Sequence, residues 1–262
     1  MTTQEITLKK TFDWRVWVFR IIAGLASLFF LAISAPYLLW PWVIVLPDMP
    51  DPESQRWFAA QWGVLGTFFW ALPLMFVMFK PSKFVNLMQY WVIGFLLISL
   101  FWFVVGEKTL ESFIILALVL FTYPNLRGLF KFEKSALSKK LAILGILAIL
   151  GCLPRLLIDI NNTLSLIGGS AEDLMVMDNF THEIDIFLYI TLGVIFVALK
   201  HSNWKIVGNI IGASLVYSGI AALFTINQAG SWGLLGGALA LLWGVSYLAI
   251  IRLEAQTSKD VA

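Results

Sequence analysis

The residues most able to do chemistry are an arginine and an aspartate that stand four positions apart in an apolar stretch. Arg155 and Asp159 lie in the segment GCLPRLLIDI, at positions 151–160. Residues four apart on a helix share a face, so the two side chains can pair. A planar guanidinium can hold a carboxylate by two parallel hydrogen bonds. We therefore expect Arg155 to form an ion pair, to bind an anionic or carbonyl group, or to take part in a proton relay.

A second group of ionisable residues occurs in the segment NFTHEIDIF, where His182, Glu183 and Asp185 stand close together. On a helix, His182 shares a face with Asp185 but not with Glu183, so at most two metal ligands converge. The segment contains no HExxH motif, and acidic residues in a first helical turn are favoured by the helix dipole. The pattern predicts capping and ion pairing, with ion or proton binding as the alternative, and no metal site.

Several of these charges fall at one predicted depth. At 1.5 Å per residue, Arg155, Asp185 and Glu111 each lie roughly 22–24 Å from a basic residue at the inner end of their helix. An unpaired charge at this depth is costly, so Arg155 needs a partner. The candidate partners are Asp159, Asp185, Glu183 and Glu111. The cluster is interpreted either as a clasp between helices or as the floor of an outward-facing pocket. The candidate ligand-binding residues are Arg155, Asp159, Glu183, Asp185, Glu111, His182 and Gln61.

The composition places these residues in a membrane protein. Of the 262 residues, 60% are hydrophobic and 13% are charged, whereas soluble domains contain about 25% charged residues. The net charge of +2 does not favour nucleic acid as a partner. A single cysteine, Cys152, excludes an intrachain disulfide and a CxxC pair.

Apolar segments long enough to cross a bilayer recur along the chain, since about 20 residues are needed for each crossing. The sequence predicts an all-α, polytopic bundle of about eight transmembrane helices within a single membrane domain, 1–262. They are expected near 16–40, 57–79, 84–106, 110–127, 139–158, 183–200, 205–226 and 232–252. A short surface helix is expected at about 170–178, in the loop that precedes the sixth span.

The distribution of charge predicts the orientation. With eight spans, fifteen of the 18 Lys and Arg residues fall on the side of the N-terminus, and the exceptions are Arg56, Lys108 and Arg155. Because basic loops stay in the cytoplasm, both termini are predicted to be cytoplasmic. We expect the protein to reside in the inner or plasma membrane of the cell.

Two weak signals concern helix packing and duplication. Short matches at offsets of 118 and 120 residues suggest a parallel repeat of four helices and four helices, with halves at 1–133 and 134–262. Small residues allow close contact between helices, and the depth of Gly219 matches that of Gly236 and Gly237.

The sequence contains no GxSxG motif, P-loop or HExxH motif, and we predict no cofactor. The favoured interpretation is a non-enzymatic carrier or binding protein for a small anionic or lipophilic molecule, with membrane lipids around it. Two alternatives remain open. One is an auxiliary or assembly subunit of a larger membrane complex, with a membrane protein as its partner, and the other is a membrane enzyme acting on lipid.

Overall fold

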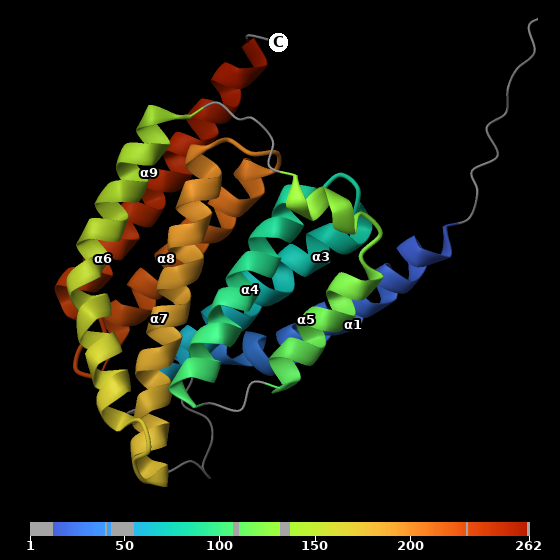
Figure 1. Cartoon of the computed structure of the whole chain (residues 1–262). Helices are drawn as coiled ribbons and strands as arrows, with labels where there is room; N and C mark the ends of the chain where they lie inside the picture. Colours follow the sequence, from blue (N-terminus) through green and yellow to red (C-terminus); the bar gives the residue numbers. More distant parts are fainter. Residues whose placement is uncertain are drawn as a thin grey trace, which may run out of the picture.

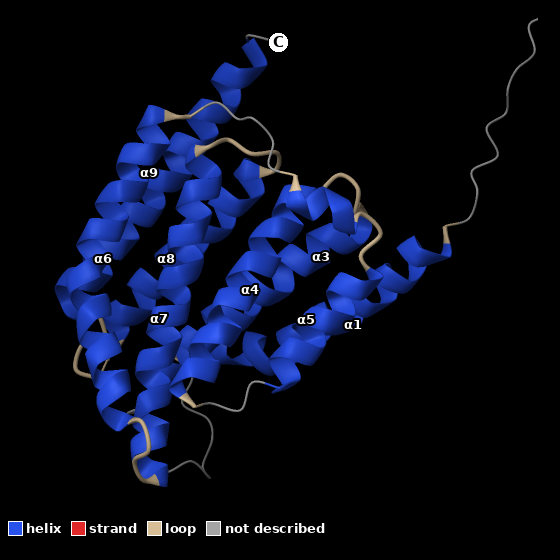
Figure 2. Cartoon of the chain, viewed as in Figure 1, coloured by secondary structure: helices blue, strands red, loops and turns tan. Residues whose placement is uncertain are grey.

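The computed structural model describes residues 13–39, 41–42, 55–106, 110–131, 137–228 and 230–260, and every regular element within them is helical (Figure 2). Seven of these helices are long and apolar enough to cross a membrane. The α5 helix, Leu110–Thr122, is apolar but shorter, and the chain then passes into the 3₁₀ turn η3. The protein is therefore an all-helical bundle with membrane character, while the count of eight crossings stays a prediction.

The helices follow the predicted order along the chain. Their bounds are α1 (Trp14–Ser34), η1 (Ala35–Leu38), α2 (Arg56–Val64), η2 (Leu65–Ala71), α3 (Leu72–Phe79), α4 (Val85–Val105), α5 (Leu110–Thr122), η3 (Leu126–Phe130), α6 (Lys139–Leu166), α7 (Ala171–Ala198), α8 (Trp204–Phe224) and α9 (Gly233–Asp260).

The loop before α7 differs from the prediction. The surface helix expected at about 170–178 is not a separate element, because α7 is continuous from Ala171 to Ala198. No glycine or proline occurs between Ala171 and Leu192, so neither residue ends a helix near the predicted boundary at 178. Helix α6 also continues past the predicted end at residue 158 to Leu166, so Arg155 and Asp159 lie within one helix.

The helices fall into two groups in space (Figure 1). Helices α6 to α9 lie together, α1, α3, α4 and α5 lie on the other side of the bundle, and α7 contacts α2 and α4 between the groups. Rings from both groups meet in the core, where Phe69 stacks on Tyr189 with centroids 5.0 Å apart. The division of the chain into halves at 1–133 and 134–262, and the duplication of these halves, stay predictions.

A π-helical turn interrupts the second span. The turn η2 widens the backbone just before Pro73, which has no N–H to donate. Two of its carbonyl groups accept hydrogen bonds from side chains of other helices. Trp91 donates its indole N–H to Trp70 O at 3.0 Å, and Ser27 donates its hydroxyl to Ala71 O at 3.0 Å. The wide turn is thus fixed between α1 and α4.

Glycines bring α8 and α9 into backbone contact. A Cβ atom built on Gly219 would lie 2.8 Å from Gly237 O, and one built on Gly244 would lie 2.9 Å from Gly212 O. Only hydrogen fits at these positions. The predicted match of Gly219 is confirmed for Gly237, whereas a Cβ atom built on Gly236 would meet Trp232. The contact between Gly219 and Gly237 holds α9 against α8 along one wall of the site described next.

Candidate functional site

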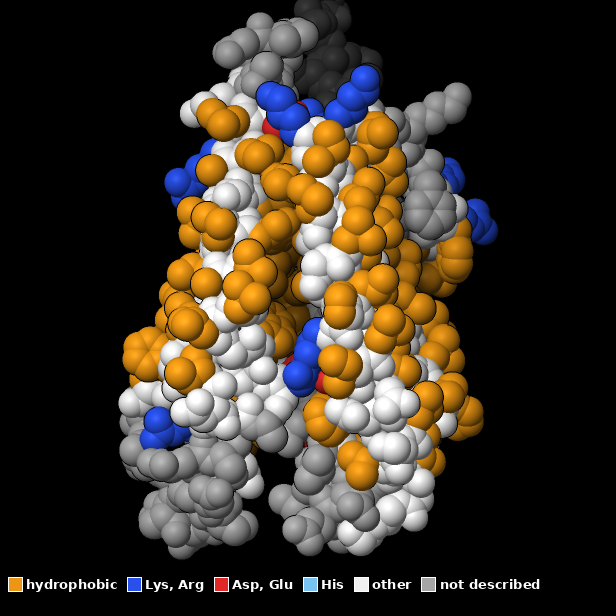
Figure 3. Space-filling view, turned by 90° about the vertical axis from the view of Figure 1, so that its left-hand side faces the viewer, with side chains coloured by type: hydrophobic (Ala, Val, Ile, Leu, Met, Phe, Trp, Pro, Cys, Tyr) orange, Lys and Arg blue, Asp and Glu red, His pale blue; other side chains and the backbone are white. Residues whose placement is uncertain are grey.

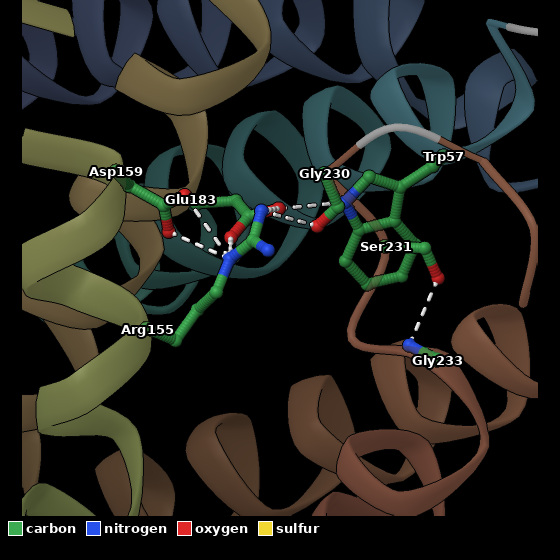
Figure 4. A network of polar contacts seen from close by, with 7 residues as sticks. All are labelled: Trp57, Arg155, Asp159, Glu183, Gly230, Ser231 and Gly233. Atoms are coloured by element: carbon green, nitrogen blue, oxygen red, sulfur yellow. Dashed lines mark hydrogen bonds and ion pairs between the residues drawn. The ribbon is translucent and has the colours of Figure 1, made fainter. Parts of the chain in front are cut away.

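An ion cluster joins α6, α7 and the loop between α8 and α9 (Figure 4). Arg155 Nε lies 3.0 Å from Asp159 Oδ2 and 3.0 Å from Glu183 Oε2, and it donates to both. Arg155 Nη2 donates to Gly230 O at 2.8 Å and to Glu183 Oε1 at 3.4 Å. One guanidinium therefore connects three segments of the chain.

The cluster is buried on its acidic side and open on its basic side. Asp159 and Glu183 are 1% and 5% exposed, whereas one third of the Arg155 side chain, 33%, is exposed. One cation faces two carboxylates, so the cluster carries a formal charge of −1 when all three groups are ionised. Removing Arg155 would leave two buried carboxylates without a counter-charge, whereas removing one carboxylate leaves a one-to-one ion pair.

Trp57, near the start of α2, connects this cluster to α2, which packs against α7 and α8. Its indole N–H donates to Glu183 Oε1 at 2.8 Å, and its backbone N–H donates to Gln228 Oε1 at 2.6 Å. The ring also packs edge-on against Trp232, with centroids 5.2 Å apart. Glu183 thus accepts hydrogen bonds from residues of both α2 and α6.

A cavity of about 500 Å³ begins at this cluster and runs between α6, α7, α8 and α9. Its wall on α6 is a stripe with the three-to-four-residue spacing of one helix face. The residues of this stripe are Leu144, Leu147, Ala148, Gly151, Cys152, Arg155, Leu156 and Asp159. Ile186, Phe187 and Ile190 line it from α7. The cavity is therefore an apolar channel with charged groups at one end.

The space-filling view shows the side of the molecule on which α6 and α9 lie (Figure 3). A groove separates two columns of mainly apolar surface, and basic and acidic side chains gather in it partway along. Leu147 and Leu239, which line the cavity, are 57% exposed. Trp243 on α9 donates its indole N–H to Leu144 O at 3.0 Å, which closes the end of the cavity opposite the ion cluster. The cavity therefore opens sideways, on an apolar face.

Two of the four candidate partners of Arg155 pair with it, namely Asp159 and Glu183. Asp185 is fully buried and accepts a hydrogen bond from the Trp102 indole at 2.9 Å. Glu111 is exposed on α5 and does not line the cavity. The remaining two acidic candidates thus lie outside the cluster.

The other two candidate ligand-binding residues also lie away from the cavity. The His182 ring packs edge-on against Phe58 and Trp62, with centroids 5.1 and 4.9 Å apart. Gln61 is 2% exposed, and its amide forms no hydrogen bond with a described residue. Among the residues that the structure describes, no group of three or more His, Cys, Asp and Glu side chains is placed to hold a metal ion.

Trp57 and the carbonyl group of Gly230 belong to the site but were not predicted from the sequence. A tryptophan near the end of a span is usually an interfacial anchor, so its type carries no specific signal. Gly230 has a φ of +82°, which suits glycine and turns its carbonyl toward Arg155. Only the folded backbone shows that this oxygen is part of the site.

Replacing Trp57 by phenylalanine should destabilise the protein by about 1.5–3 kcal/mol, the usual contribution of a hydrogen bond to a charged group. An aromatic ring is kept, although a smaller one, but Glu183 loses its donor from α2. Thermal unfolding in detergent measures the effect. Trp14→Phe is the matched control, because Trp14 is 63% exposed on α1. Equal midpoints for the two variants would contradict a stabilising role for the Trp57 indole.

Comparison of this chain with protein-family models, with curated proteins and with solved structures finds no match to any of them.

Proposed function

We propose that this protein is a non-enzymatic membrane carrier or binding protein that takes a small lipophilic molecule into the groove between α6 and α9. The observation that supports the proposal is the cavity of about 500 Å³, which is apolar along its length and has Arg155 at one end. Binding sites for small molecules are commonly apolar, with a few polar groups that fix orientation. The ligand lies along the apolar wall and reaches Arg155 with an oxygen atom.

The charge distribution supports a sidedness for this site. If basic loops lie in the cytoplasm, Arg155 lies in the outer part of the bilayer, and the groove extends from there toward the inner side. The ligand then enters sideways from the membrane, because both walls of the groove present apolar side chains. Its polar group is held near the outer surface.

The native cysteine provides the test. Cys152 is the only cysteine of the chain, lines the cavity and lies one turn from Arg155. A lipophilic ligand that fills the groove should slow the reaction of Cys152 with a membrane-permeant maleimide. The measurement is the labelling rate of the purified protein in detergent, with increasing amounts of single-chain amphiphiles.

A second cysteine position controls for general effects of the amphiphile. Leu150 is 58% exposed, stands two residues before Cys152 and does not line the cavity. Leu150→Cys in a Cys152→Ser background should label at a rate that amphiphiles do not change selectively. Equal slowing at both positions would overturn the proposal. So would cross-linking of Cys152 to a stoichiometric protein partner in native membranes, which would favour an assembly subunit.

A further inference from the structure

The distribution of polar atoms in the cavity defines the shape of its ligand. The α6 wall extends from Leu144 to Asp159, which is about 22 Å at 1.5 Å per residue. Arg155, Asp159, Glu183 and Ser231 lie at one end. The rest of the lining is apolar apart from Ser246. A molecule that matches this lining has a polar head and one long hydrocarbon chain.

The head must accept a hydrogen bond from Arg155. The guanidinium uses Nε and Nη2 for Asp159, Glu183 and Gly230. Nη1 donates to no described residue, although Arg155 lines the cavity and its side chain is 33% exposed. This nitrogen carries two N–H groups, so it can hold an anionic oxygen from the ligand.

The head group of the ligand must also supply a hydrogen-bond donor. Asp159 lines the cavity and is 1% exposed, yet its Oδ1 accepts no hydrogen bond from a described residue. That oxygen lies 3.0 Å from Arg155 Nε, which donates to Oδ2 instead. A buried carboxylate oxygen without a donor is costly, and a ligand that supplies one removes the penalty.

The charge of the cluster decides between head types. One guanidinium and two carboxylates carry a formal charge of −1, so a purely anionic head adds repulsion to its contact with Arg155. A purely cationic head leaves Nη1 without an acceptor. A head with both a phosphate oxygen and an ammonium group satisfies Arg155 Nη1 and Asp159 Oδ1 together and adds no net charge.

Building on the proposed function, we infer that the groove binds a zwitterionic membrane amphiphile, whose phosphate contacts Arg155, whose ammonium group contacts Asp159 and whose single chain follows α6 toward Leu144. The phosphoethanolamine group matches this site, since its ammonium group has N–H donors. A trimethylammonium head keeps the charge but cannot donate to Asp159 Oδ1.

The test compares amphiphiles of one chain length by the concentration that halves the Cys152 labelling rate. The probes are lysophosphatidylethanolamine, lysophosphatidylcholine, lysophosphatidic acid, an alkylammonium and free phosphoethanolamine. We expect lysophosphatidylethanolamine to protect at about tenfold lower concentration than the other chain-bearing probes, as one added charge-assisted hydrogen bond predicts. Phosphoethanolamine without a chain should give no protection.

An isosteric variant tests which side chain binds the ammonium group of the ligand. Asp159→Asn removes the carboxylate charge, and in this variant lysophosphatidylethanolamine should lose its advantage over lysophosphatidic acid. An unchanged ranking in the variant, or equal protection by all head types in the native chain, would overturn the inference but leave the proposed function standing. If no amphiphile protects Cys152, the proposed function itself fails. The comparison in the native chain does not depend on how well the variant folds.

Discussion

Replacing Arg155 by glutamine should lower the free energy of unfolding by about 3–5 kcal/mol, the usual effect of removing one partner of a buried ion pair. The variant leaves Asp159 and Glu183, which are 1% and 5% exposed, without a counter-charge. It also leaves Gly230 O without its donor. Thermal unfolding in detergent measures the loss.

Two further variants show whether charge is the cause. Combining Arg155→Gln with Asp159→Asn and Glu183→Gln removes all three charges, so the triple variant should recover a substantial part of the lost stability. Arg155→Lys keeps the charge but not the planar fork, so its effect should lie between those of the native chain and Arg155→Gln. A triple variant less stable than Arg155→Gln would contradict an electrostatic origin.

Replacing Gly219 by valine should separate α8 from α9 and lower the free energy of unfolding by about 3 kcal/mol or more, at the upper end of overpacking effects. A Cβ atom at this position would lie 2.6 Å from the backbone nitrogen of Leu241 and 2.8 Å from Gly237 O. Backbone atoms cannot rotate away as side-chain ends can. Because α9 forms one wall of the groove, the same variant should also change the labelling rate of Cys152.

Gly151→Val is the matched control for this prediction. Gly151 lies within α6, and a Cβ atom there would have no atom within 4 Å. Both variants place the same β-branched residue in a helix, so their propensity effects cancel. Unfolding midpoints in detergent that agree between the two variants would contradict the close contact at Gly219.

Local patterns predicted the helices and the nearest ion pair. Apolar runs placed the spans, because each crossing needs about 20 apolar residues, and the four-residue spacing predicted that Arg155 pairs with Asp159. This pair is confirmed. The continuity of α7 through Ala171–Ala198 differs from the prediction, which places a separate short helix at about 170–178.

Depth alone could not select the other partners of Arg155. Glu183 and Asp185 differ by two residues, so they lie about 200° apart around a helix of 3.6 residues per turn. The structure turns Glu183 to the cavity and Asp185 to Trp102 on α4. Glu111 matches the depth of Arg155, but α5 packs against α1 and α4 on the other side of the bundle. Which helices are neighbours is a tertiary property that local spacing does not encode.

The carboxylate of Glu183 is shared between the groove and Trp57 of α2. A molecule that strengthens or weakens the ion pair between Arg155 and this carboxylate also changes the stability of the contact between α2 and α7. By thermodynamic reciprocity, separating α2 from α7 must change the affinity of the groove for that molecule by the same factor. Under the proposed function, the Trp57 indole is the contact through which ligand binding in the groove affects α2.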